Sequence, residues 1–130
     1  MKVARTVLNG ESGSNAADLH NYICMGRREY ILQSIKNRSA EIMPMNAKVI
    51  LFGSQARGDY HEGSDWDILI LLDKQKLSPS DFDEFAYPLF ELGWMIDAEI
   101  HPLLYTFNDW ESRNMLPLYK DVLKEGIELC

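Results

Sequence analysis

Two apolar runs constrain the fold of this chain more than any other feature. Residues 47–52 (Ala-Lys-Val-Ile-Leu-Phe) and 66–72 (Trp-Asp-Ile-Leu-Ile-Leu-Leu) are rich in β-branched and aromatic residues and lack an alternation of polar and apolar positions. Continuous apolar runs of this kind are typical of strands that are buried on both faces. The chain therefore needs elements that cover both sides of a sheet, and its 130 residues fit one compact domain.

Helical patterns lie on either side of these runs. Isoleucines recur at helical spacing between Arg27 and Pro44, which predicts a helix before the first strand. A second helix is expected to begin after Ser78 as its N-cap and to be kinked at Pro88. Gly93 is expected to end this helix.

The last third of the chain predicts one more strand and two helices. An alternating segment at about 94–105 predicts a strand. Asn108, with Glu111 three residues later, has the pattern of a capping box for a short helix, and residues 115–125 predict the final helix. This order of elements predicts an α/β (α+β) fold, a small mixed β-sheet flanked by helices.

The N-terminal segment differs in composition from the remainder. Residues 9–15 are rich in turn formers and show no periodicity, so we expect a flexible extension over residues 1–25, in which residues 16–24 form a short helix or no regular structure, and one folded domain over 26–130. No apolar run approaches the ~20 residues of a membrane span, and the first residues lack the apolar core of a signal peptide. The cytoplasm is the expected location. Cys24 and Cys130 have no metal-site spacing and are predicted to be free thiols.

The net charge of −7 argues against long DNA or RNA as a partner. A protein that binds long DNA or RNA usually presents a basic surface that neutralises phosphates. An acidic chain can still bind a nucleotide when a divalent metal lies between its carboxylates and the phosphates.

A pair of aspartates at the start of the second apolar run carries the strongest chemical signal. On a strand, residues i and i+2 point to the same side, so Asp65 and Asp67 present two carboxylates side by side. Like charges beside an apolar strand are unfavourable unless a cation joins them. Mg²⁺ prefers oxygen ligands, and a third carboxylate from a neighbouring strand would complete a two-metal clamp. Taken alone, the pair is more often a polar turn that enters a strand.

A glycine-serine pair follows the first apolar run. Gly53 allows the backbone to approach a ligand closely, and successive N–H groups can hold a phosphate. The Ser54 hydroxyl adds a donor, and Arg57 adds positive charge for a phosphate. Taken alone, this segment is also compatible with an ordinary turn.

The joint spacing of these segments resembles a family signature. Gly53-Ser54, Arg57-Gly58 and Ser64-Asp65-x-Asp67 fall in register after a buried strand, which is similar to the DNA polymerase β-like nucleotidyltransferase superfamily and, more narrowly, to the minimal nucleotidyltransferases. The resemblance covers the chain from about Arg27 and implies that residues 26–130 are the nucleotidyltransferase domain. The residues implied to bind the nucleotide are Gly53, Ser54, Arg57 and Ser64. Those implied to be catalytic are Asp65, Asp67, Asp97 and Glu99, with Asp65, Asp67 and Asp97 as metal ligands.

The choice of the third carboxylate stays open between two residues. Asp97 and Glu99 are expected to point to the same face of the strand at 94–105. The pair Ile96-Asp97 resembles the hydrophobic-Asp pair of the family at that strand, which favours Asp97.

The resemblance also implies a reaction and a partner. The reaction is transfer of a nucleoside monophosphate, AMP from ATP, to an acceptor hydroxyl with Mg²⁺ as cofactor. Stand-alone members are often encoded beside a HEPN-domain protein, and some act as antitoxins that transfer AMP to a tyrosine of that toxin. A HEPN-type protein is therefore the expected partner, and a homodimer is also compatible with the sequence.

Two other functions are compatible with the same residues. One is transfer to a small molecule such as an aminoglycoside, although those relatives usually carry an extra helical domain. The other is a catalytically weak module that binds nucleotide or its partner and inhibits by docking. Mutation of Asp65 and Asp67 separates the last function from an enzyme, because a docking module keeps its effect.

Overall fold

The computed structural model describes the backbone from residue 16 and the side chains from residue 26. The chain divides into two compact units, Met1–Ser34 and Ile35–Cys130. The flexible segment predicted over residues 1–25 lies, for residues 1–15, outside the described part, whereas helix α1 (Ala16–Ile42) begins at Ala16. Gly26 interrupts the helical geometry of α1 with φ 76° and ψ 166°. The sheet and the candidate site belong to the second unit.

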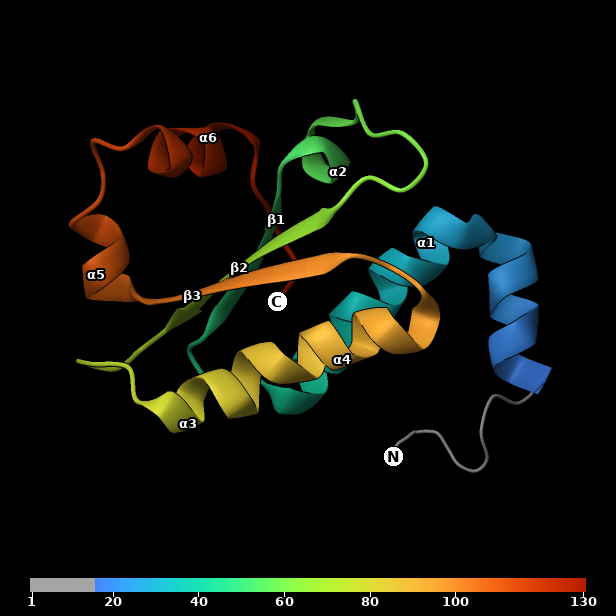
Figure 1. Ribbon diagram of the computed structural model, residues 1–130, viewed down its shortest axis with the longest axis horizontal. Coiled ribbons are helices and arrows are strands. Elements are labelled where there is room, and N and C mark those ends of the chain that lie inside the picture. The colour runs from blue at the N-terminus through green and yellow to red at the C-terminus, as the bar shows by residue number, and fades with distance from the viewer. Residues whose placement is uncertain (1–15) are drawn as a thin grey trace. The chain divides into compact units, whose positions relative to one another are not determined.

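Four strands form one mixed sheet in the order β3-β2-β1-β4 (Figure 1). Strands β1 (Lys48–Phe52) and β2 (Trp66–Leu72) pair antiparallel, and they confirm the two apolar runs as strands. Strand β3 (Ile100–Thr106) pairs parallel with β2. Strand β4 (Ile127–Glu128) pairs antiparallel with β1 and was not predicted, because two residues show no periodicity.

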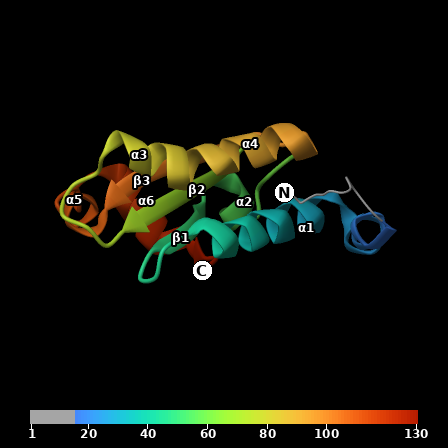
Figure 2. The same cartoon turned by 90° about the horizontal axis from the view of Figure 1, so that it is seen from below.

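Helices cover both faces of the sheet (Figures 1 and 2). On one face, α3 (Pro79–Asp81), η1 (Phe82–Ala86) and α4 (Tyr87–Ile96) form a nearly continuous rod, and α4 contacts β3. On the other face lie α5 (Phe107–Glu111) and α6 (Pro117–Glu125), and α6 contacts β1. The predicted α/β (α+β) fold, a small mixed β-sheet flanked by helices, is confirmed.

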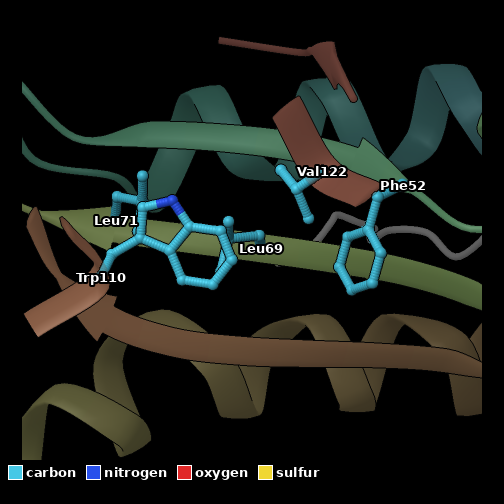
Figure 3. Packing of buried hydrophobic residues seen from close by; sticks show 5 residues of the cluster. All are labelled: Phe52, Leu69, Leu71, Trp110 and Val122. Atoms are coloured by element: carbon cyan, nitrogen blue, oxygen red, sulfur yellow. The ribbon is translucent and has the colours of Figure 1, made fainter. Parts of the chain in front are cut away.

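The two faces explain why β2 shows no alternation. Ile68 and Ile70 point to the side of α4, while Leu69 and Leu71 point to the side of α5 and α6, and none of the four is more than 4% exposed. Burying each such side chain stabilises the fold by roughly 1.5–3 kcal/mol. The cluster on the second side consists of Phe52, Leu69, Leu71, Trp110 and Val122 (Figure 3).

The end of α4 differs from the prediction. Gly93 is buried inside the helix, where a Cβ would meet the carbonyl oxygen of Ala98 at 2.5 Å. The Ala98 N–H donates to the Gly93 carbonyl at 2.8 Å, so the missing side chain lets the chain fold back over the last turn. The helix ends at Asp97, whose φ is 58°. The strand predicted at 94–105 is therefore wrong in its first half.

The irregularity predicted at Pro88 takes the form of a π-helical turn, η1. Pro88 has no N–H to donate to the carbonyl of Glu84, four residues earlier. The Tyr87 N–H donates to the Phe82 carbonyl, five residues earlier, which gives the wider turn. The distortion therefore lies just before the proline.

The start of α5 also differs from the prediction. Asn108 is the second residue of this helix, and Thr106 is its N-cap. The Thr106 Oγ1 accepts from the Asp109 N–H at 3.1 Å. Thr106 is at once the last residue of β3 and the cap, so the capping box predicted for Asn108 and Glu111 is wrong.

Candidate active site

The end of β1 and the start of β2 bring a glycine and an aspartate into contact. Phe52 is the register partner of Asp67, so Gly53 leaves the strand beside the Asp67 side chain. Gly53 is buried with φ 80°, and a Cβ at this position would overlap the Asp67 carboxylate. Both the left-handed backbone and the close approach require glycine. A single-turn helix, α2 (Ser54–Arg57), follows directly.

The two predicted carboxylates share this edge of the sheet. Asp67 is half-buried, whereas the Asp65 side chain is 56% exposed. Burial raises the pKa of Asp67, and the neighbouring Asp65 carboxylate raises it further. Electrostatic interactions with His101 and Arg57 act in the opposite direction and lower the pKa of Asp67. The charged form of the pair is therefore unfavourable by itself, and a cation would stabilise it.

Strand β3 places a histidine beside the carboxylates. His101 is the register partner of Asp67 on the parallel neighbour, so both side chains lie on one face of the sheet. The His101 Nε2 lies 3.7 Å from the Asp65 Oδ1, and both side chains are exposed. The position on β3 directly beside Asp67 thus carries an imidazole.

Asp97 and Glu99 do not lie on β3, contrary to the expectation that they share a strand face. Asp97 is the C-cap of α4 because the helix continues three residues beyond Gly93. Glu99 lies just before β3, and its backbone carbonyl accepts from the Trp66 N–H at 2.8 Å. Trp66 stands between the two aspartates in sequence, so the Glu99 backbone is held at the same edge of the sheet. Both acidic side chains are exposed.

The serines predicted for nucleotide binding flank the loop between the two motifs. Ser54 is the first residue of α2 and is half-buried. The Ser64 hydroxyl accepts from the His61 N–H at 2.8 Å, and the Ser64 carbonyl accepts from the Gln55 Nε2 at 3.4 Å. Ser64 therefore fixes the shape of the loop that leads into β2.

Glu125, the last residue of α6, was not predicted as part of this site. Its Oε2 accepts from the Gly53 N–H at 2.7 Å. Both carboxylate oxygens also accept from the Arg57 Nη1, at 3.4 and 3.1 Å. The Glu125 side chain is 12% exposed. The sequence signal is a charged residue before Gly126, which is indistinguishable from the solvated end of any helix.

The residue types at this edge fit magnesium. Asp65 and Asp67 offer the oxygen ligands that Mg²⁺ prefers. Among the side chains from residue 26 onward, which the structure describes, no three His, Cys, Asp or Glu residues are grouped so that they could hold a metal ion. Mg²⁺ here would thus take further ligands from substrate phosphates and water, as it commonly does.

Two simpler expectations can be compared with the described residues. Cys130 is an exposed free thiol, as predicted; the side chain of Cys24 lies outside the described part. In that part of the chain, no helix is long and apolar enough to cross a membrane.

Comparisons with known proteins agree with the geometry. The model of the family described as "Nucleotidyltransferase domain" matches residues 30–128. A Methanocaldococcus jannaschii protein, provisionally named a protein adenylyltransferase, is 35% identical over 79 residues, which cover 61% of this chain and 73% of the relative.

Solved structures share the fold. A crystal structure of a toxin–antitoxin with AMP-PNP superposes with a TM-score of 0.54 at 23% identity, over 76% of this chain and 72% of that chain. A toxin–antitoxin MntA–HpeT structure with two aspartate-to-glutamate substitutions gives a TM-score of 0.52 at 20% identity, over 76% and 71%.

Proposed function

This chain belongs to the nucleotidyltransferase domain family, and we propose that it transfers AMP from ATP, with Mg²⁺, to a hydroxyl group of a partner protein. Membership makes the chain a transferase of nucleotidyl groups. The finer assignment is supported by the name of the M. jannaschii relative, a protein adenylyltransferase. The choice of ATP as donor is supported by the toxin–antitoxin crystal structure of the same fold, which was solved with AMP-PNP.

The observation that carries the proposal is the contact between Gly53 and Asp67. This contact brings a left-handed glycine, which leads into α2, against one of two adjacent carboxylates. The loop would bind the donor phosphates through Ser54 and through Arg57, while Asp65 and Asp67 would hold the metal. When bound, Mg²⁺ would neutralise charge on the phosphates and lower the pKa of the attacking hydroxyl.

The proposed step is an in-line displacement at the α-phosphorus. The acceptor oxygen forms a bond to this phosphorus, the bond to the bridging oxygen of the β-phosphate breaks, and pyrophosphate leaves. A carboxylate at the site takes the hydroxyl proton. Most of the rate enhancement would come from positioning and charge neutralisation, because the protein forms no covalent bond in this step.

For the third carboxylate we propose Glu99 ahead of Asp97. The Glu99 carbonyl accepts from the N–H of Trp66, which stands between the two aspartates in sequence. Asp97 lies two residues earlier, at the end of α4. Glu99→Gln should therefore reduce the transfer rate more than Asp97→Asn does.

An exposed apolar surface on α4 supports a protein as the acceptor. Trp94 and Met95 are each 67% exposed, and the Tyr87 ring, 42% exposed, packs edge-on against Trp94. Exposed aromatic residues of this kind are enriched where proteins bind one another. We propose that the acceptor is a tyrosine of a HEPN-type toxin. An aminoglycoside is the small-molecule alternative to be tested beside it.

The test is transfer from α-labelled ATP, CTP, GTP and UTP in Mg²⁺, with the HEPN-type partner or an aminoglycoside as acceptor. The active-site variant is Asp65→Asn/Asp67→Asn. Asp73→Asn is the matched control, because Asp73 is an exposed carboxylate just after the far end of β2. We expect label from ATP on the partner with the wild type and the control, and none with the active-site variant.

The same experiment separates an enzyme from a docking module. The exposed surface on α4 would also serve a protein that inhibits its partner by binding alone. Absence of label with all four triphosphates, together with a stable complex that Asp65→Asn/Asp67→Asn still forms and still inhibits, would refute the transferase proposal and support docking.

A further inference from the structure

Glu125 contacts the candidate site, but the function proposed above uses it neither as a metal ligand nor as a phosphate ligand. We propose that Glu125 is a positioning residue that holds the Arg57 guanidinium and the Gly53 backbone in the geometry that receives the donor phosphates. The proposal rests on the nucleotidyltransferase function proposed above. It assigns to α6 a role in nucleotide binding, although α6 is remote in sequence from both motifs.

The hydrogen bonds of Glu125 join two separate parts of residues 53–58, the loop that would bind the donor phosphates. One carboxylate oxygen accepts from the Gly53 N–H at 2.7 Å, at the end of β1. The same carboxylate accepts from the Arg57 Nη1 at 3.1 Å, at the end of α2. A single side chain therefore holds both Gly53, the first residue of the segment that would surround the phosphates, and Arg57, which carries the positive charge of this segment.

The elements on either side of Glu125 keep its backbone in place. Val122, one turn earlier, is buried in the apolar cluster beneath α6. Gly126 follows directly, and a Cβ there would meet the Ile50 side chain at 2.8 Å, so the chain lies tightly against β1. The next residues form β4 and pair with β1. These contacts fix the Glu125 backbone beside Gly53, and its carboxylate accepts hydrogen bonds from both Gly53 and Arg57, so we infer that Glu125 stays while the nucleotide binds.

Arg57 also pairs with a second carboxylate, that of Asp59, which would hold the guanidinium in another place if Glu125 were absent. The Arg57 Nε donates to Asp59 at 3.2 Å, and both side chains of this pair are largely exposed, 46% for Arg57 and 63% for Asp59. Glu125 is 12% exposed. Exposed ion pairs have little energetic weight, whereas a largely buried, hydrogen-bonded carboxylate fixes the geometry of its partner. Without Glu125, the guanidinium would follow Asp59 toward solvent, away from the site.

The test is the binding of the fluorescent analogue mant-ATP, in Mg²⁺, to the full chain and its variants. We expect Glu125→Gln to weaken binding about tenfold, the size of one lost hydrogen bond between charged groups. Asp59→Asn is the matched control, because it removes the same charge from the same arginine and leaves Glu125 in place. It should change the affinity by less than about twofold.

A double-mutant cycle distinguishes positioning from a general loss of structure. In an Arg57→Ala background, Glu125→Gln should weaken mant-ATP binding by clearly less than tenfold, because only the Glu125 contact with the Gly53 N–H is left to lose. Glu125→Asp, which keeps the carboxylate on a shorter side chain, should restore part of the affinity. If Glu125→Gln does not fold, a folded Glu125→Asp/Asp59→Asn variant keeps the proposal testable. An affinity for mant-ATP equal to that of the wild type in this variant would contradict the proposal, because the shorter side chain places the carboxylate differently.

Three results with Glu125→Gln would also overturn the proposal. These are unchanged or tighter mant-ATP binding by Glu125→Gln, equal losses in Glu125→Gln and Asp59→Asn, or a full loss from Glu125→Gln in the Arg57→Ala background. Tighter binding would show instead that Glu125 competes with phosphate. Failure of the wild type to bind any mant-nucleotide would be a different result, since it removes the proposed function and with it this inference.

Discussion

Replacement of Gly53 by alanine measures how strongly the approach of β1 to β2 constrains the candidate site. Two separate effects are expected at this position. The backbone of Gly53, with φ 80° and ψ −160°, lies in a region almost confined to glycine, and a residue with a Cβ there costs roughly 1–3 kcal/mol. The new methyl group would also overlap the Asp67 carboxylate, and overpacking of this kind costs roughly 1–3 kcal/mol more.

Gly63→Ala measures the cost of a Cβ at a positive φ where there is no clash. Gly63 has φ 84°, close to that of Gly53, but no atom lies within 4 Å of the position of its Cβ. We therefore expect Gly63→Ala to lower the free energy of unfolding by about 1–2 kcal/mol. Gly53→Ala should lower it by about 2–6 kcal/mol, the sum of the two effects.

Urea denaturation of both variants measures the difference, and the transfer assay measures its consequence. A domain of typical stability, about 5–15 kcal/mol, stays folded in Gly63→Ala, and it stays folded in Gly53→Ala when its own stability exceeds the loss. Because Asp67 must move away from the new methyl group, Gly53→Ala should lose transfer activity while Gly63→Ala retains it. Equal losses of unfolding free energy in the two variants, or full activity in Gly53→Ala, would refute the close contact as the reason for glycine.

Two further predictions concern stability away from the site. The Lys74 ammonium, 2.8 and 3.0 Å from the carboxylate oxygens, lowers the pKa of Asp81, and the Ser78 N–H adds to this. A lowered pKa stabilises the fold above the ordinary pKa of an aspartate and loses this effect as pH falls through the folded-state value. The melting temperature of Asp81→Asn should therefore lie below that of the wild type at neutral pH, and the gap should close in acid; a gap independent of pH would contradict the pairing. Leu89→Ala, at a fully buried position of α4, should lower the unfolding free energy by about 2–5 kcal/mol. Leu123→Ala, at a side chain 77% exposed, should change it by less than about 0.5 kcal/mol, and similar values for the two in urea denaturation would show that the burial is assigned wrongly.

The parts of the fold that were predictable are those whose signal is local. The runs that became β1 and β2 are apolar on both faces because helices cover both sides, and this leaves a continuous hydrophobic pattern in the sequence. Gly53 marks the end of β1, as predicted, because only glycine fits against Asp67. Both features leave their signal in a few consecutive residues, although the contacts behind them involve other elements.

The end of α4 could not be predicted, because the signal used there has a second meaning. Glycine after a helical pattern usually marks its C-terminus. Gly93 is instead required by the chain that returns over the helix, with the Ala98 carbonyl oxygen 2.5 Å from where its Cβ would be. The left-handed residue that ends the helix is Asp97. The shift moved Asp97 and Glu99 off the predicted strand and left His101 beside Asp67.

Glu125 could not be predicted for a different reason. Its place in the site depends on α6 packing against β1 and on the pairing of β4, both of which join distant parts of the chain. No pattern near residue 125 distinguishes a carboxylate that points at Gly53 from one that points at solvent. Only the assembled sheet shows the contact.

The Gly53–Glu125 hydrogen bond has a consequence for folding, because it joins residues 72 positions apart. Closing so long a loop costs conformational entropy, and pairings between distant segments tend to form slowly. A β1–β2 hairpin that forms first would therefore lack a complete nucleotide loop, and the nucleotide of the proposed function would bind only the finished domain. Binding that is restricted to the native state raises global stability by mass action. With the proposed function, ATP would then stabilise the native state of this protein against complete unfolding, in addition to supplying the AMP that is transferred.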